Sequence, residues 1–184
     1  MHPLVSEAMK KAAIVWLTVG ERRPYPVWCL WIDDALHVVS EPSETTRQST
    51  GERRVVSEGS QSPGEQAAPG LDTATTATVT ARGDHGGRIV SWPAAVSRVE
   101  PGGEQWEQVV PLLASKRLNL PASEDTSARW AADCVISRLE PAGDPSEAGE
   151  TLPDKSHAAP PPETPAARRT AKPFRLHKVR GATK

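Results

Sequence analysis

The sequence has little cysteine and no grouping of residues suited to a metal. Cys29 and Cys134 are the only two cysteines, and each lies inside its own apolar run. Neither a CxxC pair nor a cluster of cysteine and histidine occurs, which excludes the usual patterns of a structural zinc site and of a disulfide-rich scaffold. We therefore expect a protein without a metal centre.

Long apolar runs are missing as well. No window approaches the roughly 18 apolar residues of a transmembrane helix. Near the N-terminus, Lys10 and Lys11 precede an apolar stretch of only about seven residues, which charged residues follow at once, so the pattern is not that of a signal peptide. These absences predict a soluble, cytoplasmic protein with no membrane span.

Apolar residues make up only 37% of the chain, against roughly 45–50% in typical globular domains. The deficit comes from particular stretches. Residues 1–140 carry 14 basic and 18 acidic side chains, whereas residues 164–184 carry seven basic ones and no acid. We interpret residues 1–140 as one mildly acidic domain and residues 141–184 as a disordered, proline-rich tail with a basic end.

The residue pattern of the domain predicts mostly strands. Runs rich in strand-forming residues lie at 12–19, 26–32, 35–40, 73–81, 88–99 and 134–139. Helical spacing of apolar residues occurs at 1–11, 104–118 and 126–132. Because a flat sheet of six strands would leave exposed edges, we predict a mainly β fold, a six-stranded antiparallel split β-barrel with two or three short helices.

A polar stretch at residues 41–69 interrupts this pattern. It has almost no apolar content, and Val38-Val39-Ser40-Glu41 recurs within it as Val55-Val56-Ser57-Glu58. We interpret it as a disordered loop that contains an inserted or duplicated segment, although loops of this length inside a domain can also be functional.

Two prolines mark irregularities in the expected elements. Pro93 has no N–H for a ladder, so it predicts a bulge or a local edge in the strand at 88–99. Pro111 removes an internal hydrogen bond from the helix at 104–118 and should kink or restart it.

Several basic residues are candidates for an anion site. Arg82, His85 and Arg88 bracket a glycine-rich turn, and Arg88 with Ser91 at the start of a strand is the better functional pair, since guanidinium groups match phosphate. The alternative is a solvated hairpin tip. Lys116 and Arg117 could complete a phosphate pocket, or only place favourable charge at a helix end.

Two tryptophans in the second strand have alternative roles. Trp28 and Trp31 differ in parity and should lie on opposite faces. One of them could stack on a cofactor ring or line a dimer groove, and the other reading is ordinary packing. No nucleophile constellation emerges, because nothing supplies a third orienting group for a pairing of Cys29 with His37.

The strand order and the residue pattern of residues 8–140 resemble those of the pyridoxamine-phosphate-oxidase-like split barrels, which include flavin and deazaflavin reductases. The resemblance rests on Pro26-Val27-Trp28-Cys29-Leu30-Trp31, on a third strand that ends at Ser40, and on the stretch from Arg82 through Trp92. It implies an FMN or deazaflavin cofactor at a homodimer interface and the activity of an oxidoreductase. The cofactor-binding residues that we predict are Trp28, Ser40, Arg88, Ser91, Lys116 and Arg117.

The sequence departs from this family at one position. Flavin-binding members follow the third strand with a short basic helix of the Lys-x-x-Asn type, whose place is taken here by the stretch 41–69. The alternative function is therefore a cofactor-free, dimerising binding module. In that case the basic tail at 164–184 would contact nucleic acid or another anionic or protein partner.

Overall fold

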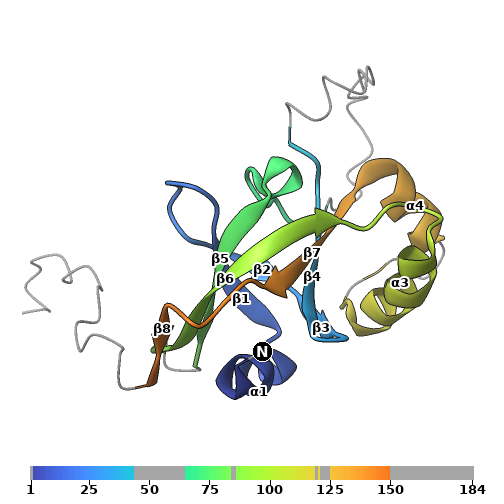
Figure 1. Cartoon of the computed structure of the whole chain (residues 1–184). Coiled ribbons are helices and arrows are strands. Elements are labelled where there is room, and N and C mark those ends of the chain that lie inside the picture. The colour runs from blue at the N-terminus through green and yellow to red at the C-terminus, as the bar shows by residue number, and fades with distance from the viewer. Residues whose placement is uncertain (1, 44–64, 84–85, 119, 121–124, 150–184) are drawn as a thin grey trace, which may run out of the picture. The chain divides into compact units, whose positions relative to one another are not determined.

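A computed structural model describes residues 2–43, 65–83, 86–118, 120 and 125–149 (Figure 1). These residues belong to one compact unit, which extends over Met1–Leu152. Its helices are α1 (Pro3–Lys11), α3 (Glu104–Lys116) and α4 (Thr126–Asp133), with a 3₁₀ turn η1 (Leu71–Thr73). Its strands are β1 (Ile14–Thr18), β2 (Tyr25–Trp28), β3 (Leu30–Ile32), β4 (Ala35–Ser40), β5 (Thr76–Arg82), β6 (Arg88–Arg98), β7 (Val135–Pro141) and β8 (Glu147–Ala148).

The sheet is antiparallel and nearly closes on itself. Its strand order is β2-β1-β5-β6-β7-β4-β3, and β8 adds to β6 outside this path. The first and last strands of the order, β2 and β3, are consecutive in the chain and separated only by Cys29. One bent run therefore pairs with β1 through its first half and with β4 through its second. This arrangement confirms the predicted split barrel.

The strand count differs from the prediction for two reasons. The run expected at 26–32 divides at Cys29, whose N–H donates to the carbonyl of Ala13, and β8 lies beyond the expected end of the domain. The other expected strands agree with the structure to within a few residues.

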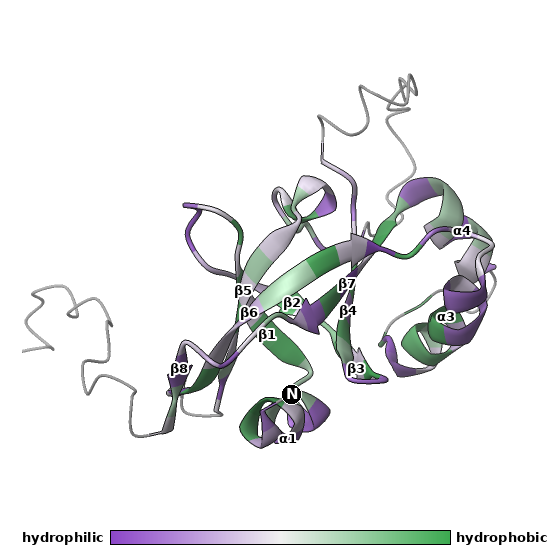
Figure 2. Cartoon of the chain, in the orientation of Figure 1, coloured by the Kyte–Doolittle hydropathy of each residue, from purple (hydrophilic) through white to green (hydrophobic). Residues whose placement is uncertain are grey.

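The strands contribute side chains to two apolar cores, and Figure 2 shows hydrophobic residues in green along the strands and the helices. One core fills the barrel and includes Val15, Leu17, Val79, Trp92 and Leu139, together with Val5 and Met9 of α1. The other lies outside the barrel, between the sheet and the helices α3 and α4, and includes Val39, Trp106, Leu113, Trp130 and Ile136. The sheet thus has helices packed on only part of its outer surface.

Helix α1 begins at a favourable terminus and packs against the barrel. Pro3 is the first helical residue, and the Nδ1 atom of His2 accepts a hydrogen bond from the N–H of Leu4 at 3.2 Å. Val5 and Met9, four residues apart and on one face, are each 1% exposed. The predicted apolar face of residues 1–11 is confirmed.

Prolines and turns follow their sequence signals in most cases. Pro93 lies where β6 changes partner, after the pairing of Val90 and Ser91 with β8 and before the pairing with β7 that starts at Ala94. This is the predicted local edge. Helix α3, in contrast, runs without a break through Pro111.

The two aspartates between β3 and β4 have positive φ angles of 46° for Asp33 and 59° for Asp34. Both angles suit a tight hairpin turn of the primed type, and Asp tolerates this region better than most residues. The short loop sets the register in which Leu30 lies opposite His37.

Parts of two predicted irregular stretches are ordered. Within the expected loop 41–69, residues 44–64 lie outside the described residues, while Ala68 is 5% exposed and a parallel bridge joins Glu41 to Ala67. Within the expected tail, strand β8 is described and residues 150–184 are not. In the described part of the chain, no helix is long and apolar enough to cross a membrane.

Candidate functional site

The register of four strands places a row of side chains on the outer surface of the barrel. Pro26 of β2 lies opposite Trp16 of β1, Trp16 opposite Thr80 of β5, and Thr80 opposite Ser91 of β6. Their chain neighbours Val15, Leu17, Val79 and Trp92 point into the barrel core, so this row points outward. We call the outer surface of β2, β1, β5 and the first half of β6 the exposed sheet face.

The exposed sheet face carries two tryptophan–arginine stacks. The guanidinium of Arg82 lies 4.6 Å from the centre of the Trp16 ring, and that of Arg117 lies 4.9 Å from the centre of the Trp28 ring. Ile14 pairs with Trp28 and precedes Trp16 by two residues, so the two tryptophans are diagonal neighbours on adjacent strands. Ile14 is 57% exposed, which leaves an apolar patch open beside both rings.

At the β6 end of this face, an internal carboxylate holds the two residues predicted as an anion-binding pair. Arg88 donates from Nη1 to both oxygens of Glu147, at 2.6 and 2.7 Å, and the Ser91 hydroxyl donates to the same carboxylate at 3.0 Å. The Ser91 and Thr80 hydroxyls are also hydrogen-bonded at 2.9 Å. Glu147 of β8 therefore occupies the position that a bound anion would take.

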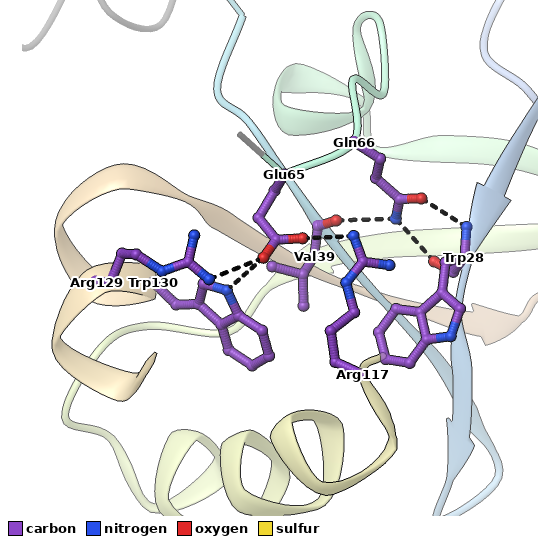
Figure 3. A network of polar contacts seen from close by, with 7 residues as sticks. All are labelled: Trp28, Val39, Glu65, Gln66, Arg117, Arg129 and Trp130. Carbon is purple, nitrogen blue, oxygen red and sulfur yellow. Dashed lines mark hydrogen bonds and ion pairs between the residues drawn. The ribbon is translucent and has the colours of Figure 1, made fainter. Parts of the chain in front are cut away.

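At the β2 end lies a second carboxylate, which is buried and accepts hydrogen bonds from three donors (Figure 3). Glu65 Oε2 accepts from Arg117 Nη2 at 2.7 Å, while Oε1 accepts from Trp130 Nε1 at 2.9 Å and from Arg129 Nη2 at 3.2 Å. The Glu65 side chain is 4% exposed and those of the two arginines are 20% and 18% exposed. A carboxylate so deeply buried requires such partners, because desolvation of an unpaired charge is costly.

The neighbouring residue, Gln66, binds the backbone of two strands. Its Oε1 atom accepts from the N–H of Trp28 at 2.6 Å, and its Nε2 atom donates to the carbonyls of Trp28 at 2.8 Å and Val39 at 2.9 Å. Figure 3 shows this side chain between the end of β2 and the strand β4. Gln66 thus fixes the position of Trp28 at the border of the exposed sheet face.

The structure brings some of the predicted site residues together and separates others. Trp28, Arg88, Ser91 and Arg117 all lie on or beside the exposed sheet face, at its two ends. Lys116 is exposed at the end of α3.

Ser40 is fully buried, and its hydroxyl has no hydrogen-bond partner. It shares the parity of Leu36 and Val38, whose side chains point into the barrel core. Its side chain therefore lies on the other side of the wall from the exposed sheet face. His85 of the glycine-rich turn lies outside the described residues.

Sequence reasoning missed Trp16, Glu65, Gln66 and Glu147, and it named Arg82 only as a candidate for an anion site. Trp16 could have been found from alternation and register, since it has the outward parity of its strand. Glu65 and Gln66 stand in a polar stretch without periodicity, and their contacts are with residues far away in sequence. No local signal distinguishes such residues from a solvated loop.

Burial shifts the pKa values of three groups that are not part of the exposed sheet face. It raises the pKa of the Cys29 and Cys134 thiols to about 12, so both thiols are protonated at neutral pH. Burial, together with the nearby Arg138, lowers the pKa of His37 to about 4, so this imidazole is neutral. None of the three is poised as a nucleophile or base. Among the described residues, no group of three or more His, Cys, Asp or Glu side chains could hold a metal ion.

The cofactor that the family resemblance implies fits this site in one part only. Paired aromatic rings and guanidinium groups on an exposed sheet suit a planar ring system. The phosphate group of such a cofactor has no free binding site here, because Glu147 and Glu65 already form ion pairs with Arg88 and Arg117. A phosphate would have to compete with these carboxylates.

Comparison with known proteins gives distant structural likenesses only. The sequence matches no family model and no curated protein. The haem storage protein HutZ from Vibrio cholerae is similar in structure, with 12% identity, a TM-score of 0.47, and coverage of 78% of this chain and 92% of that one. An FAD-binding protein from Mesorhizobium loti has 13% identity, a TM-score of 0.45, and coverage of 78% and 91%.

A third similar structure is a Listeria innocua protein provisionally described as a pyridoxamine 5'-phosphate oxidase. It has 13% identity and a TM-score of 0.45, with coverage of 74% of this chain and 90% of that one. At such values the likeness is one of general arrangement. The fold assignment made above rests on the strand order and register of this chain, which is a mainly β split barrel with three helices in its described part.

Proposed function

We propose that the exposed sheet face binds the planar ring system of FMN or a deazaflavin, and that the protein is a flavin-type oxidoreductase that works as a homodimer. The observation that carries this proposal is the pair of diagonal stacks, Trp16 with Arg82 and Trp28 with Arg117. Aromatic surface packs against a fused ring, and a guanidinium group stacks on the same kind of surface while adding positive charge.

The row of hydroxyls supports the same use of the face. Thr80 and Ser91 lie one and two strand spacings from Trp16, which corresponds to about 5 and 10 Å. A ring system that lies across these strands would meet aromatic surface at one end and, at the other, the half-buried Thr80 next to Ser91, which is buried and held by Glu147. When bound, a flavin or deazaflavin supplies hydride or electron transfer, and the residues of the face contribute binding and orientation.

The direct test is the visible absorbance of the purified protein, followed by titration with riboflavin, FMN and a deazaflavin. We expect bound yellow cofactor or saturable binding of at least one of the three. Replacement Arg82→Ala should weaken the binding about fivefold, the size of a cation–π contribution of roughly 1 kcal/mol.

A matched control for this test is Arg98→Ala, which also removes an arginine from a strand. Arg98 is paired only loosely with Glu100, at 3.9 Å, at the far end of β6. We expect Arg98→Ala to leave the binding unchanged. A colourless protein that takes up none of the three compounds would remove the proposal.

A second candidate function is a binding module without a cofactor, and the internal carboxylates favour it. Glu65 and Glu147 neutralise the two arginines that a cofactor phosphate would need. In this case the basic segment 164–184 would supply a salt-sensitive contact with nucleic acid or another anionic partner. Deletion of residues 164–184 should then abolish this binding, and unchanged binding would contradict the idea.

A further inference from the structure

The donors around Glu65 form an anion receptor whose parts come from separate elements. Arg117 follows α3, whereas Arg129 and Trp130 belong to α4, and all three donate to one carboxylate within 3.2 Å. The Trp130 indole is fully buried and hydrogen-bonds only through Nε1–H. Donors that converge in this way recognise an anion of any source that reaches the same position.

The receptor also borders the proposed binding surface. The guanidinium of Arg117 that donates to Glu65 is the one that stacks on Trp28. A ligand on Trp28 would therefore meet Arg117 at its edge. If that ligand carried a phosphate there, the phosphate and the Glu65 carboxylate would compete for the same donors.

We infer that Glu65 is a resident anion that makes the site selective: it excludes ligands with a phosphate at the Arg117 end, and its removal converts Arg117, Arg129 and Trp130 into a phosphate-binding site. This inference deepens the proposed function and rests on it for the identity of the ring ligand. The phosphate group carries between −1.5 and −2 charges at neutral pH and has three acceptor oxygens, so it can replace a carboxylate on these donors.

The first test uses inorganic phosphate alone and does not depend on any ring ligand. The variants are Glu65→Ala, which empties the receptor, and Glu65→Gln, which keeps the shape and the acceptor for Trp130. Thermal unfolding is followed with and without millimolar phosphate, with sodium chloride at equal ionic strength as the reference. We expect phosphate to raise the Tm of Glu65→Ala by about 3 °C or more and to leave the wild type unchanged.

Two controls separate this site from general effects of salt. Glu100→Ala removes an exposed carboxylate, 73% exposed, that pairs with Arg98 and not with a residue of the receptor, and it should gain no phosphate response. The double variant Glu65→Ala with Arg117→Ala should lose the response that the single variant gains. If Glu65→Ala does not fold, Glu65→Gln takes its place, and phosphate binding is measured by titration calorimetry. We then expect Glu65→Gln to bind phosphate at least tenfold more tightly than the wild type does. An equal response in wild type and variants would overturn the inference.

The second test addresses selectivity directly. The wild type should bind riboflavin at least threefold more tightly than FMN, because Glu65 opposes the phosphate, and Glu65→Gln should prefer FMN by tenfold or more. A wild type that prefers FMN tenfold would overturn the inference. If neither flavin binds to any variant, the proposed function fails, while the phosphate response still decides whether Glu65 fills an anion receptor.

Discussion

His37 is a buried histidine in the middle of β4, where it is 1% exposed, and its ring nitrogens make no hydrogen bond with another side chain. The charged groups that act on it are Arg138 of the neighbouring strand β7, which disfavours its protonation, and the more weakly acting Asp33 and Glu140. Burial is the largest cause of its lowered pKa. The folded barrel therefore holds this imidazole in its neutral form.

This depressed pKa predicts a loss of stability in mild acid. Since the unfolded chain binds a proton near pH 6.5 and the folded one only near pH 4, the stability is fully present above pH 6.5 and falls as the pH drops through this window. The loss at pH 4 should reach about 3 kcal/mol. The free energy of unfolding of the wild type and of His37→Phe can be measured with urea between pH 7 and pH 4. An equal dependence on pH in the two proteins would contradict the prediction.

The burial of the two thiols predicts that they react slowly with thiol reagents. Cys29 and Cys134 are 1% and 6% exposed, and their pKa values near 12 leave almost no thiolate at pH 8. We expect an aromatic disulfide reagent to modify neither thiol within minutes in the folded protein and both of them in guanidinium chloride. Rapid modification of the native protein would show that the closed barrel opens at these positions.

At the scale of elements, Gln66 closes a seam of the barrel. Strands β2 and β4 are not neighbours in the sheet, yet the Gln66 amide joins the backbone of Trp28 to that of Val39. The Gln66 side chain thus takes the place of backbone hydrogen bonds between strands, which are not made where the chain bends at Cys29. Buried backbone groups require such partners.

We expect Gln66→Ala to cost about 2 kcal/mol of unfolding free energy, because it leaves buried backbone groups unsatisfied. The matched control is Gln108→Ala, since Gln108 makes only an exposed contact with Glu104 at 3.4 Å. That control should change the free energy by less than about 0.5 kcal/mol. Chemical denaturation measures both unfolding free energies. Equal losses in the two variants would contradict a role of Gln66 in holding β2 and β4 together.

These elements show how far local sequence can predict this fold. Runs of strand-forming residues predicted the strands of the sheet path, with β2 and β3 as one run, and helical spacing predicted α1, because these signals lie within a few residues. The division at Cys29 was not readable, since it depends on which strands pair at each end of the run. Helix α3 also continues through Pro111, although this residue has no N–H for an internal hydrogen bond.

The candidate site was predicted less completely for the same reason. The sequence pointed to Trp28, Arg88, Ser91 and Arg117, which have the right chemistry, but not to the carboxylates that neutralise the arginines. Glu147 lies 59 residues from Arg88, and Glu65 lies 52 residues from Arg117. Only the folded barrel brings these charges into contact.

At the scale of the whole molecule, the exposed sheet face has the character of an association surface. Two tryptophan rings and the 57% exposed Ile14 lie on a regular sheet, and a second sheet can pack against such a face. We expect the purified protein to be a dimer and Ile14→Glu to shift it towards the 19.8 kDa monomer. Light scattering after size-exclusion chromatography measures this, and a wild-type monomer at micromolar concentration would contradict the prediction.

The two points between which residues 44–64 run are both anchored. On one side, the N–H of Ser43 donates to the Asp72 carboxylate at 2.8 Å, and that of Glu41 donates to the carbonyl of Gln66 at 3.1 Å. On the other side stand the polar contacts of Glu65 and Gln66. The described residues on both sides of this stretch are therefore held by the barrel itself, so that Glu65 enters the site from a fixed starting point.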